Sequence, residues 1–272
     1  MFNGLVNTVA ATVLGEATDR PPAVFVHGVL SWGDDDAYGF GAQRPLAAHR
    51  RLVLMDRRGY GASPDLPPGP YRSDYAVDAQ DVVTLLGDGA HLVGHSYGAV
   101  AAMLAAAARP DLVRSLCLIQ PGSLRAAESH PVVAEVLARN RAASAALPVD
   151  LTPEQYLRLS TESVGMPAPE PTPARLRAAR TTMHERPCWD AEVPLDPLAE
   201  AGFPVLVVRG DWAGAPEEYR RLAGVPLMIT AEVVADRLGG RLLTVPGFYP
   251  QVQQPEAVNA ALGQLWERGD QR

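Results

Sequence analysis

The sequence contains no lysine, so all 24 of its basic residues are arginine, and it is rich in alanine, glycine and proline. This composition is typical of a GC-rich bacterial genome and says nothing about mechanism. Cations are also the minority charge, with a formal net charge of −7 and a pI near 5.4. Because nucleic acids and anionic membrane surfaces are bound through clustered cations, neither is expected as a partner. A small neutral or cationic molecule suits this chain better.

Long apolar runs are absent as well. No segment approaches the roughly 18 apolar residues that a membrane span needs, and residues 1–10 lack a basic region ahead of an apolar stretch. We therefore expect a soluble, cytoplasmic protein. Its 272 residues suit one α/β domain with an insertion. The sequence leaves open whether the chain forms a homodimer.

Cysteine is scarce. Cys117 and Cys188 form neither a metal-binding spacing nor a disulfide framework. Cys117 lies within the apolar run "LCLI" and is expected to be a buried thiol. We predict no cofactor and no metal site.

Short apolar runs bounded by glycine and proline alternate with alanine-rich stretches of helical period. This pattern is typical of a mostly parallel sheet with helices on both faces. The expected strands lie at residues 5–15, 23–28, 51–56, 90–95, 113–120, 204–210 and 240–246. The expected helices cover roughly residues 73–87, 97–109, 230–238 and 255–267.

Residues 122–195 break this alternation, because they contain helical patterns and no credible strand. Between two such patterns lies "GMPAPEPTP", whose prolines exclude a continuous helix. An all-helical insertion would form a cap over the carboxyl ends of the strands, where ligands of open α/β sheets bind. The chain is thus divided into a core at 1–121, a cap at 122–195 and a second core part at 196–272.

The strongest motif is "AHLVGHSYGAVAAMLAAA" at residues 90–107, in which Gly94, Ser96 and Gly98 fit the pattern G-x-S-x-G. The motif stands between an apolar strand and a helix rich in small residues. That context predicts a nucleophile elbow, a strained turn that projects the serine Oγ above the sheet at a helix N-terminus.

At these residues the chain resembles the α/β-hydrolase fold family. "HG" at His27 and Gly28, and "DRRGYGAS" at residues 56–63, match two further motifs of that family. The resemblance implies a mostly parallel, eight-stranded sheet. It also implies an oxyanion hole made of backbone N–H groups, here that of Tyr97 and one from the turn at Val29 and Leu30.

The chain departs from the family where the catalytic histidine belongs. "VPGFYPQVQQPEAVN" at residues 245–259 resembles the family pattern "PGxGHxPQxxxPExxN", but it is two residues shorter and has Phe248 in the histidine's place. The usual acid position holds Ala213, with Asp211 two residues early. Some relatives carry the acid in "LxxIEPP", and this chain has Gln120 in the corresponding "LCLIQPG". The base and both acid positions are therefore missing together.

A serine triad without its histidine loses about a millionfold in kcat, so efficient hydrolysis would need another base. His49 should end a surface helix, and His91 should lie about 16 Å from Ser96, at the far end of its strand. The side chain of His95 should point away from Oγ. Only His130 and His184, both in the cap, could descend into the pocket.

The remaining candidates are pocket residues. The acidic run of Asp34, Asp35 and Asp36 is expected to be mainly solvated. Ser96, Gln120 and Tyr249 are the uncharged hydrogen-bonding groups expected to act on a substrate. The predicted substrate pocket consists of His27, Trp32, His95, Met183, His184, Trp189 and Phe248.

Three hypotheses follow. In the first, the protein positions an apolar, polyketide-like substrate, polarises its carbonyl and promotes a cyclisation, elimination or isomerisation. In the second, it is an esterase, lactonase or thioesterase with a relocated base, His184 or His130, and Asp211 or one of residues 34–36 as acid. In the third, it binds a small molecule without turning it over, which fold alone does not exclude.

Overall fold

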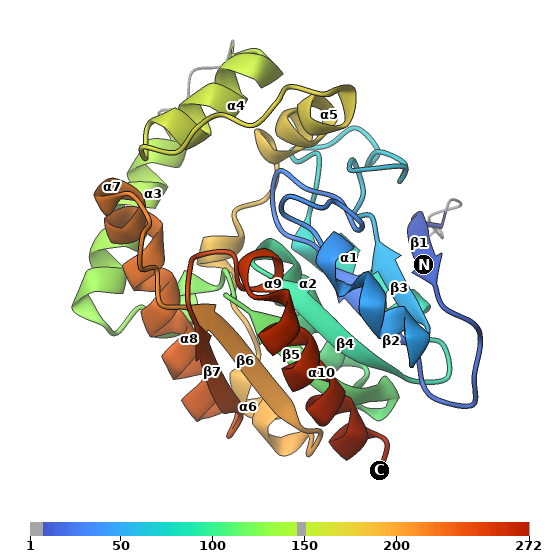
Figure 1. Cartoon of the computed structure of the whole chain (residues 1–272). Helices are drawn as coiled ribbons and strands as arrows, with labels where there is room; N and C mark the ends of the chain where they lie inside the picture. Colours follow the sequence, from blue (N-terminus) through green and yellow to red (C-terminus); the bar gives the residue numbers. More distant parts are fainter. Residues whose placement is uncertain (1–7, 146–150, 272) are drawn as a thin grey trace.

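A seven-stranded sheet forms the centre of the protein (Figure 1). The computed structural model describes residues 8–145 and 151–271. The strands run in the order β1-β3-β2-β4-β5-β6-β7, and only β1 is antiparallel to its neighbour. They are β1 (Ala11–Leu14), β2 (Ala23–Val26), β3 (Leu52–Met55), β4 (Ala90–His95), β5 (Val113–Ile119), β6 (Val205–Gly210) and β7 (Arg241–Val245). Each expected strand has a counterpart, although β1 covers only part of the expected residues 5–15, of which residues 5–7 lie outside the described residues. Among the described residues the sheet has seven strands, which corrects the expected eight.

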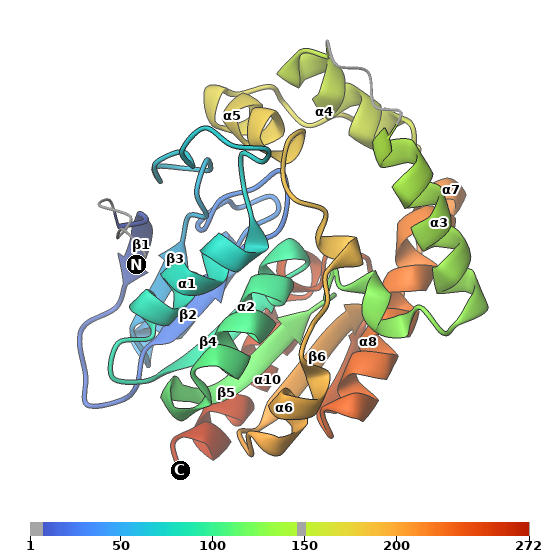
Figure 2. The same ribbon diagram turned by 180° about the vertical axis from the view of Figure 1, so that it is seen from behind.

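Helices cover both faces of the sheet, so its central strands β4 and β5 are buried along almost their whole length (Figure 2). Alternate strand residues pack into two separate cores. One face packs against α1 (Tyr75–Leu85), α2 (Tyr97–Ala108), α6 (Leu195–Glu200) and α8 (Val225–Arg237). The other packs mainly against α10 (Pro255–Gly269), and it includes Cys117, which is buried as expected. No helix of the described ranges is long and apolar enough to cross a membrane.

Short elements complete the loops around the sheet. They are the 3-10 helices η1 (Gly41–Ala48), η2 (Pro110–Leu112), η3 (Leu124–Ala127) and η4 (Cys188–Asp190), the helices α7 (Glu217–Tyr219) and α9 (Pro250–Gln253), and the π-helical turn η5 (Arg220–Gly224). Because η5 joins α7 directly to α8, the loop after β6 runs as a continuous helical segment into the core.

The segment between β5 and β6 carries three longer helices, called the cap below. They are α3 (Pro131–Ala145), α4 (Pro153–Glu162) and α5 (Pro173–Thr182), and they arch over the carboxyl end of the sheet (Figures 1 and 2). A capping box of Thr152 and Gln155 begins α4, and the Thr172 side chain caps α5. "GMPAPEPTP" forms the non-helical connection between them, as expected. The boundaries at residues 121 and 196 stay a prediction.

Helix α5 is fastened to the core by buried polar contacts. Arg175 forms an ion pair with Asp35 at 2.8 Å, donates to the Leu30 carbonyl, and stacks on the rings of Trp32 and Tyr38. The expectation of a solvated acidic run is therefore wrong for Asp35, which is buried because it balances this arginine. Its neighbours in the run contact Arg44 instead.

Candidate active site

The elbow forms as the G-x-S-x-G motif predicts. Ser96 lies between β4 and α2 with φ of 52° and ψ of −113°, a strained conformation of the kind found at functional sites. A Cβ atom at Gly94 would overlap the α2 backbone, and one at Gly98 would overlap the Val26 carbonyl oxygen. Glycine at both positions therefore allows helix α2 to approach the sheet closely enough to present the serine.

Backbone N–H groups near Ser96 match the oxyanion prediction in part. Tyr97 is the first residue of α2, where N–H groups have no acceptor within the helix. Val29 lies in the wall of the pocket that contains Ser96. The N–H of Leu30, by contrast, donates to Thr182 Oγ1 at 3.1 Å, so the prediction of Leu30 as an oxyanion donor is corrected. That Tyr97 and Val29 provide the two oxyanion donors stays a prediction.

Gln120 occupies the alternative acid position and connects two loops. Its Nε2 donates to the Phe248 carbonyl oxygen at 3.1 Å, and its Oε1 accepts from the Gly210 N–H at 3.2 Å. A glutamate could make only the second of these bonds when ionised, since a carboxylate has no donor. The amide therefore stabilises the loops that carry the catalytic acid and base in the family pattern.

Asp211 is likewise committed to backbone. Its Oδ1 accepts from the N–H groups of Ala213 and Gly247, each at 2.9 Å. These bonds fix the turn after β6 against the turn after β7. Asp211 therefore has a structural role here, and the pocket that contains Ser96 does not include it.

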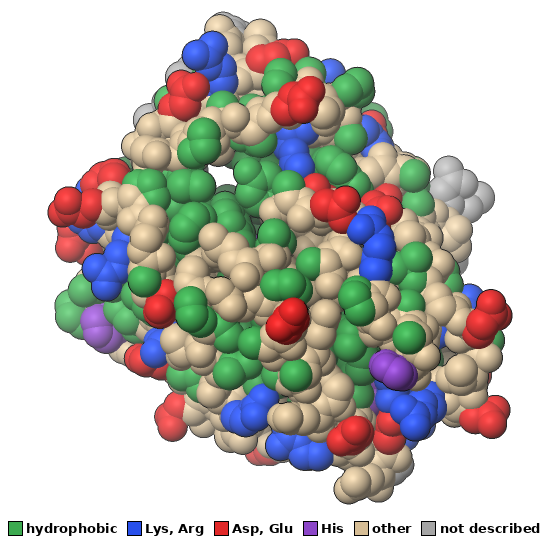
Figure 3. Space-filling view, in the orientation of Figure 1, with side chains coloured by type: hydrophobic (Ala, Val, Ile, Leu, Met, Phe, Trp, Pro, Cys, Tyr) green, Lys and Arg blue, Asp and Glu red, His purple; other side chains and the backbone are tan. Residues whose placement is uncertain are grey.

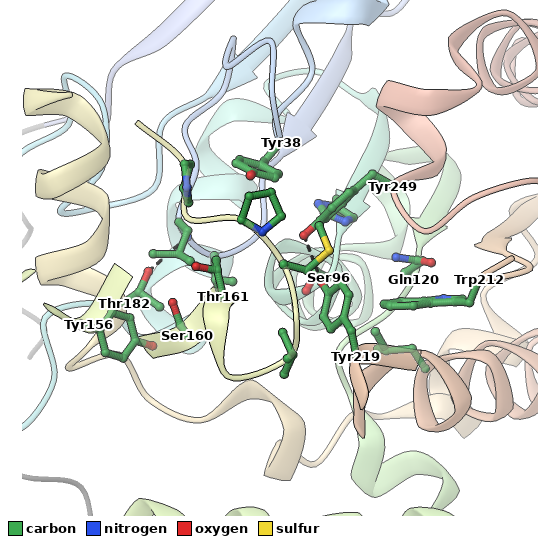
Figure 4. A pocket seen from close by; sticks show the side chains of 18 residues that line it. Tyr38, Ser96, Gln120, Tyr156, Ser160, Thr161, Thr182, Trp212, Tyr219 and Tyr249 are labelled. Atoms are coloured by element: carbon green, nitrogen blue, oxygen red, sulfur yellow. Dashed lines mark hydrogen bonds between the residues drawn. The ribbon is translucent and has the colours of Figure 1, made fainter. Parts of the chain in front are cut away.

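The shortened loop after β7 places a tyrosine, rather than Phe248, in the pocket. The Phe248 ring packs against Trp212 and Tyr219, with centroids 5.9 Å and 6.0 Å away, and it is not part of the pocket wall. Tyr249 lines the pocket, and its hydroxyl lies 3.0 Å from that of Tyr219 (Figure 4). Gln253 Oε1 accepts from the N–H groups of both loop residues at 2.7 Å, which holds the turn in this form.

The two cap histidines do not reach the site. His130 is exposed, and its Nδ1 accepts from the Val132 N–H beside the start of α3. His184 is also exposed and lies outside the pocket wall. The prediction that either could descend into the pocket is therefore corrected, because the turn after α5 points His184 toward solvent. A relocated base from the cap is not present in this geometry.

The core histidines have other partners. His27 Nε2 accepts from the Arg57 N–H at 3.0 Å, and its Nδ1 lies 2.8 Å from the Gly28 oxygen, which fits a structural role outside the pocket wall. His91 contacts Ser115 and Asp270 at the opposite end of β4. Both rings are held in the core by these bonds.

Among the described residues of the pocket wall His95 is the one histidine, and its ring lies beside Gly28; that it points away from Ser96 Oγ stays a prediction. Within the described chain its Nδ1 has no hydrogen-bond partner, and no hydrogen bond joins the ring to Ser96 Oγ. Burial lowers the pKa of His95 to about 4. The ring is therefore neutral at pH 7 and a weak proton acceptor.

The pocket is a cavity of about 220 Å³ at the carboxyl ends of the strands, roofed by α4 and α5. Figure 3 shows an opening beneath the cap, surrounded by hydrophobic side chains. The wall is mostly apolar and carries four tyrosines. It consists of Val29, Leu30, Tyr38, His95, Ser96, Gln120, Tyr156, Ser160, Thr161, Val164, Met166, Pro167, Pro169, Thr182, Trp212, Tyr219, Leu227 and Tyr249.

Three further predicted pocket residues lie elsewhere, so that His95 is the one of the seven in the described pocket wall. Trp32 stacks on Arg175, Trp189 packs against a small core between α3 and α8, and Met183 follows the last turn of α5. Several residues of the wall were not predicted from the sequence, namely Tyr38, Tyr156, Thr182, Trp212 and Tyr219. A signal existed for the residues of α4, because Tyr156 and Ser160 stand four positions apart on one helix face.

Comparisons with known proteins agree with this architecture. Residues 23–261 match the sequence profile of the Alpha/beta hydrolase family. Over 101 residues the chain is 37% identical to a pimeloyl-(acyl-carrier protein) methyl ester esterase of Aeromonas salmonicida, covering 36% of this chain and 37% of that protein. Over 105 residues it is 37% identical to a 2-(acetamidomethylene)succinate hydrolase of Mesorhizobium japonicum, covering 38% and 37%. The matches thus span little more than a third of these curated relatives.

Solved structures share the fold along nearly the whole chain. A hydrolase from Pseudomonas aeruginosa superposes with a TM-score of 0.62 at 23% identity, covering 94% of this chain and 93% of that one. A thermophilic esterase from Thermogutta terrifontis gives 0.64 at 20% identity, covering 96% and 94%. With its elbow, its sheet order and the profile match over most of its length, the chain belongs to the alpha/beta hydrolase family.

Proposed function

We propose that this protein is an α/β-hydrolase-fold enzyme that works without a Ser-His-acid triad. In this proposal it catalyses a non-hydrolytic cyclisation, elimination or isomerisation of a small, mostly apolar, polyketide-like molecule that contains a carbonyl group. The observation that carries the proposal is the surroundings of Ser96. Tyr249 stands where the loop after β7 enters the pocket, and the Gln120 amide is bonded to the loop backbone.

The rate acceleration lost with the catalytic histidine is too large for efficient hydrolysis to be expected. Without its histidine, a triad keeps about a thousandfold to ten-thousandfold acceleration over water, from the oxyanion hole and binding alone. The neutral His95 has a pKa of about 4 and makes no hydrogen bond to Ser96 Oγ among the described residues. Serine therefore serves better as a hydrogen-bond donor to substrate than as a nucleophile.

The pocket supplies what a positioning enzyme needs. Aromatic rings line the cavity, and hydroxyl groups from core and cap can orient polar atoms of a substrate (Figure 4). The N–H groups of Tyr97 and Val29 can polarise its carbonyl oxygen. An uncharged residue at position 120 also avoids activating water beside an ester or lactone. The cavity is below the usual 300–1,000 Å³ of drug-sized sites, which favours a small or partly protruding substrate.

Hydrolysis is the second candidate, because the two matching relatives described above are an esterase and a hydrolase. In this structure it would have to use His95, whose unpartnered Nδ1 lies in the same pocket. The third hypothesis, binding without turnover, predicts that a bound ligand is recovered unchanged.

A panel of p-nitrophenyl esters and acyl thioesters distinguishes the first two candidates. We expect wild-type protein and the Ser96→Ala variant to hydrolyse them at similar rates, no more than about ten-thousandfold above water. Incubation with unsaturated polyketide-type ketones, followed by mass spectrometry, should give products of unchanged mass or of mass reduced by water. Fast ester turnover that disappears in Ser96→Ala and in His95→Asn would establish the hydrolase instead.

A further inference from the structure

A chain of hydrogen bonds leads from the pocket wall into the core. Thr182, at the end of α5, lines the pocket, and its Oγ1 accepts from the Leu30 N–H at 3.1 Å. The Tyr60 hydroxyl lies 3.0 Å from this oxygen and donates to Glu185 Oε2 at 2.6 Å. Tyr60 is fully buried. The chain therefore connects a hydroxyl at the ligand cavity to a carboxyl group that the cavity does not reach.

The inner end of this chain holds more negative than positive charge. Arg57 is buried between two acids, with Nη2 3.3 Å from Glu185 Oε2 and Nη1 3.1 Å from Asp78 Oδ2. The side chains of Arg57 and Asp78 are fully buried, and that of Glu185 is 8% exposed. One cation does not fully compensate two carboxylates in a weakly polar interior, so the two acids titrate as a coupled pair, and burial raises the pKa of Asp78 to about 6 as well.

We propose that Thr182, Tyr60 and Glu185 form a proton relay in which the Thr182 hydroxyl is the group that exchanges a proton with the substrate. The relay supplies the acid-base function that the absent histidine would have performed, and it rests on the proposed non-hydrolytic function. Thr182 is the catalytic residue, while Tyr60 and Glu185 act through it as positioning and proton-holding residues.

The hydrogen-bond directions are consistent with proton abstraction. When Glu185 is ionised, Tyr60 donates to it and Thr182 donates to the Tyr60 oxygen. A threonine oxygen has two acceptor sites, and the Leu30 N–H occupies one, which leaves one for a substrate proton. As the substrate proton moves to Thr182, the threonine proton moves to Tyr60 and the tyrosine proton moves to Glu185. The carboxylate becomes a carboxylic acid, the hydroxyl groups are regenerated, and the reverse sequence protonates a substrate.

The surroundings of Glu185 favour this exchange at neutral pH. Burial raises the pKa of Glu185 to about 7, although Arg57 and the Tyr60 hydrogen bond act to lower it. Burial also raises the pKa of Tyr60 well above its usual value, so the phenol passes a proton on and is not itself ionised. The groups that interact electrostatically with Glu185 are Arg57, Tyr60, Asp78, Tyr97, Tyr156 and Cys188.

The test uses 5-nitrobenzisoxazole, a small aromatic probe that reports proton abstraction without any nucleophile. A base takes its C3 proton, the N–O bond breaks, and a coloured cyanophenolate forms, while the proton ends on Glu185. For wild-type protein we expect kcat/KM to rise about tenfold per pH unit below pH 7 and to level off above it. In Glu185→Gln, which keeps acceptors for Tyr60 and Arg57, this rise should disappear and the rate at pH 8 should fall about a hundredfold.

Three further variants separate a relay from a structural contact. Tyr60→Phe interrupts the chain of hydrogen bonds but keeps the ion pair of Arg57 and Glu185, which fastens the cap. This variant should therefore stay folded and lose the rise of kcat/KM with pH. Thr182→Val should lose it as well, whereas Thr182→Ser should keep most of it. The matched controls Glu162→Gln and Tyr71→Phe are outside the pocket and should behave as wild type.

Several results would overturn the relay. The first is a rise of kcat/KM with pH that is unchanged in Glu185→Gln or Tyr60→Phe. The second is a rise that occurs near pH 4 and depends on His95. The third is a wild-type rate at pH 8 that is no faster than the rate in buffer. None of these results bears on Ser96, so a failed relay and a failed non-hydrolytic function are told apart by the ester panel described above.

Discussion

Replacing Gln120 by glutamate, the residue of the family pattern, should destabilise this protein in a strongly pH-dependent way. In the wild type the amide donates to the Phe248 carbonyl at 3.1 Å, and the side chain is 3% exposed. An ionised glutamate at position 120 would keep the bond from the Gly210 N–H, but it would place its other oxygen against the Phe248 carbonyl and leave these two facing oxygens without a donor. The protonated acid, in contrast, can donate to Phe248 as the amide does.

The magnitude follows from these contacts. Losing the bond and leaving the buried carbonyl unsatisfied costs about 1–3 kcal/mol, and burying the charge costs more. Both costs fall on the ionised form alone, so together they raise the native pKa, and a rise of about two units corresponds to about 2.7 kcal/mol at high pH. Because the native state then binds the proton more tightly than the unfolded chain, stability falls as pH rises from about 4.3 through the native pKa. We expect Gln120→Glu to be within about 1 kcal/mol of wild type at pH 4 and about 2–4 kcal/mol less stable at pH 8.

Urea unfolding at pH 4.5, 6 and 8 measures this difference directly. Gln80→Glu, on the exposed face of α1, is the matched control and should show little dependence on pH. A destabilisation of Gln120→Glu that stays constant from pH 4.5 to pH 8 would show that ionisation of the new carboxyl group is not its cause. A variant that is more stable than wild type at pH 8 would also contradict the prediction, since the loop would then accept a buried carboxylate.

Two further substitutions test the site and the cap. His95 has a pKa lowered to about 4 by burial, so between pH 6.5 and 4 the unfolded chain takes up a proton that the folded chain does not. Wild-type protein should therefore lose up to about 3 kcal/mol of stability over that interval relative to His95→Asn, as measured by urea unfolding at each pH. Equal pH dependence of stability in both proteins would show that the ring is not buried as described. Arg175→Ala leaves Asp35 as an unpaired buried charge and should cost about 3–5 kcal/mol, measured by thermal and urea unfolding. Arg158→Ala, which removes an exposed pair, should cost less than about 1 kcal/mol, and similar losses in the two variants would contradict the anchoring role of Arg175.

The sheet and the elbow could be predicted because their signals are local. Short apolar runs, bounded by glycine and proline, identified each strand, and Gly94 and Gly98 are dictated by the close approach of α2 to the sheet. The apolar wall of the cavity could not be predicted in the same way. Tyr156 and Thr182 reach the pocket because α4 and α5 fold back over the strand ends, and that depends on contacts more than 100 residues apart in sequence, such as those of Arg175.

The loop after β7 shows the limit of pattern matching. A family pattern shortened by two residues does not say which of two adjacent aromatics faces the pocket. The outcome depends on Gln253, whose side chain closes the turn and directs Tyr249 inward while Phe248 packs on Trp212. Asp35 is a similar case, because an acidic run gives no sign that one member is buried against a distant arginine.

The proposal that no base activates Ser96 can be tested by its reactivity with a fluorophosphonate, because this reagent labels a serine only when a base activates its hydroxyl. Labelling is followed by intact-protein mass spectrometry at pH 7.5, with an active serine esterase as reference and Ser96→Ala as blank. If no base activates Ser96, the wild-type protein stays essentially unmodified over the time in which the esterase is fully labelled. Stoichiometric labelling at Ser96 on that timescale, abolished in His95→Asn, would contradict it.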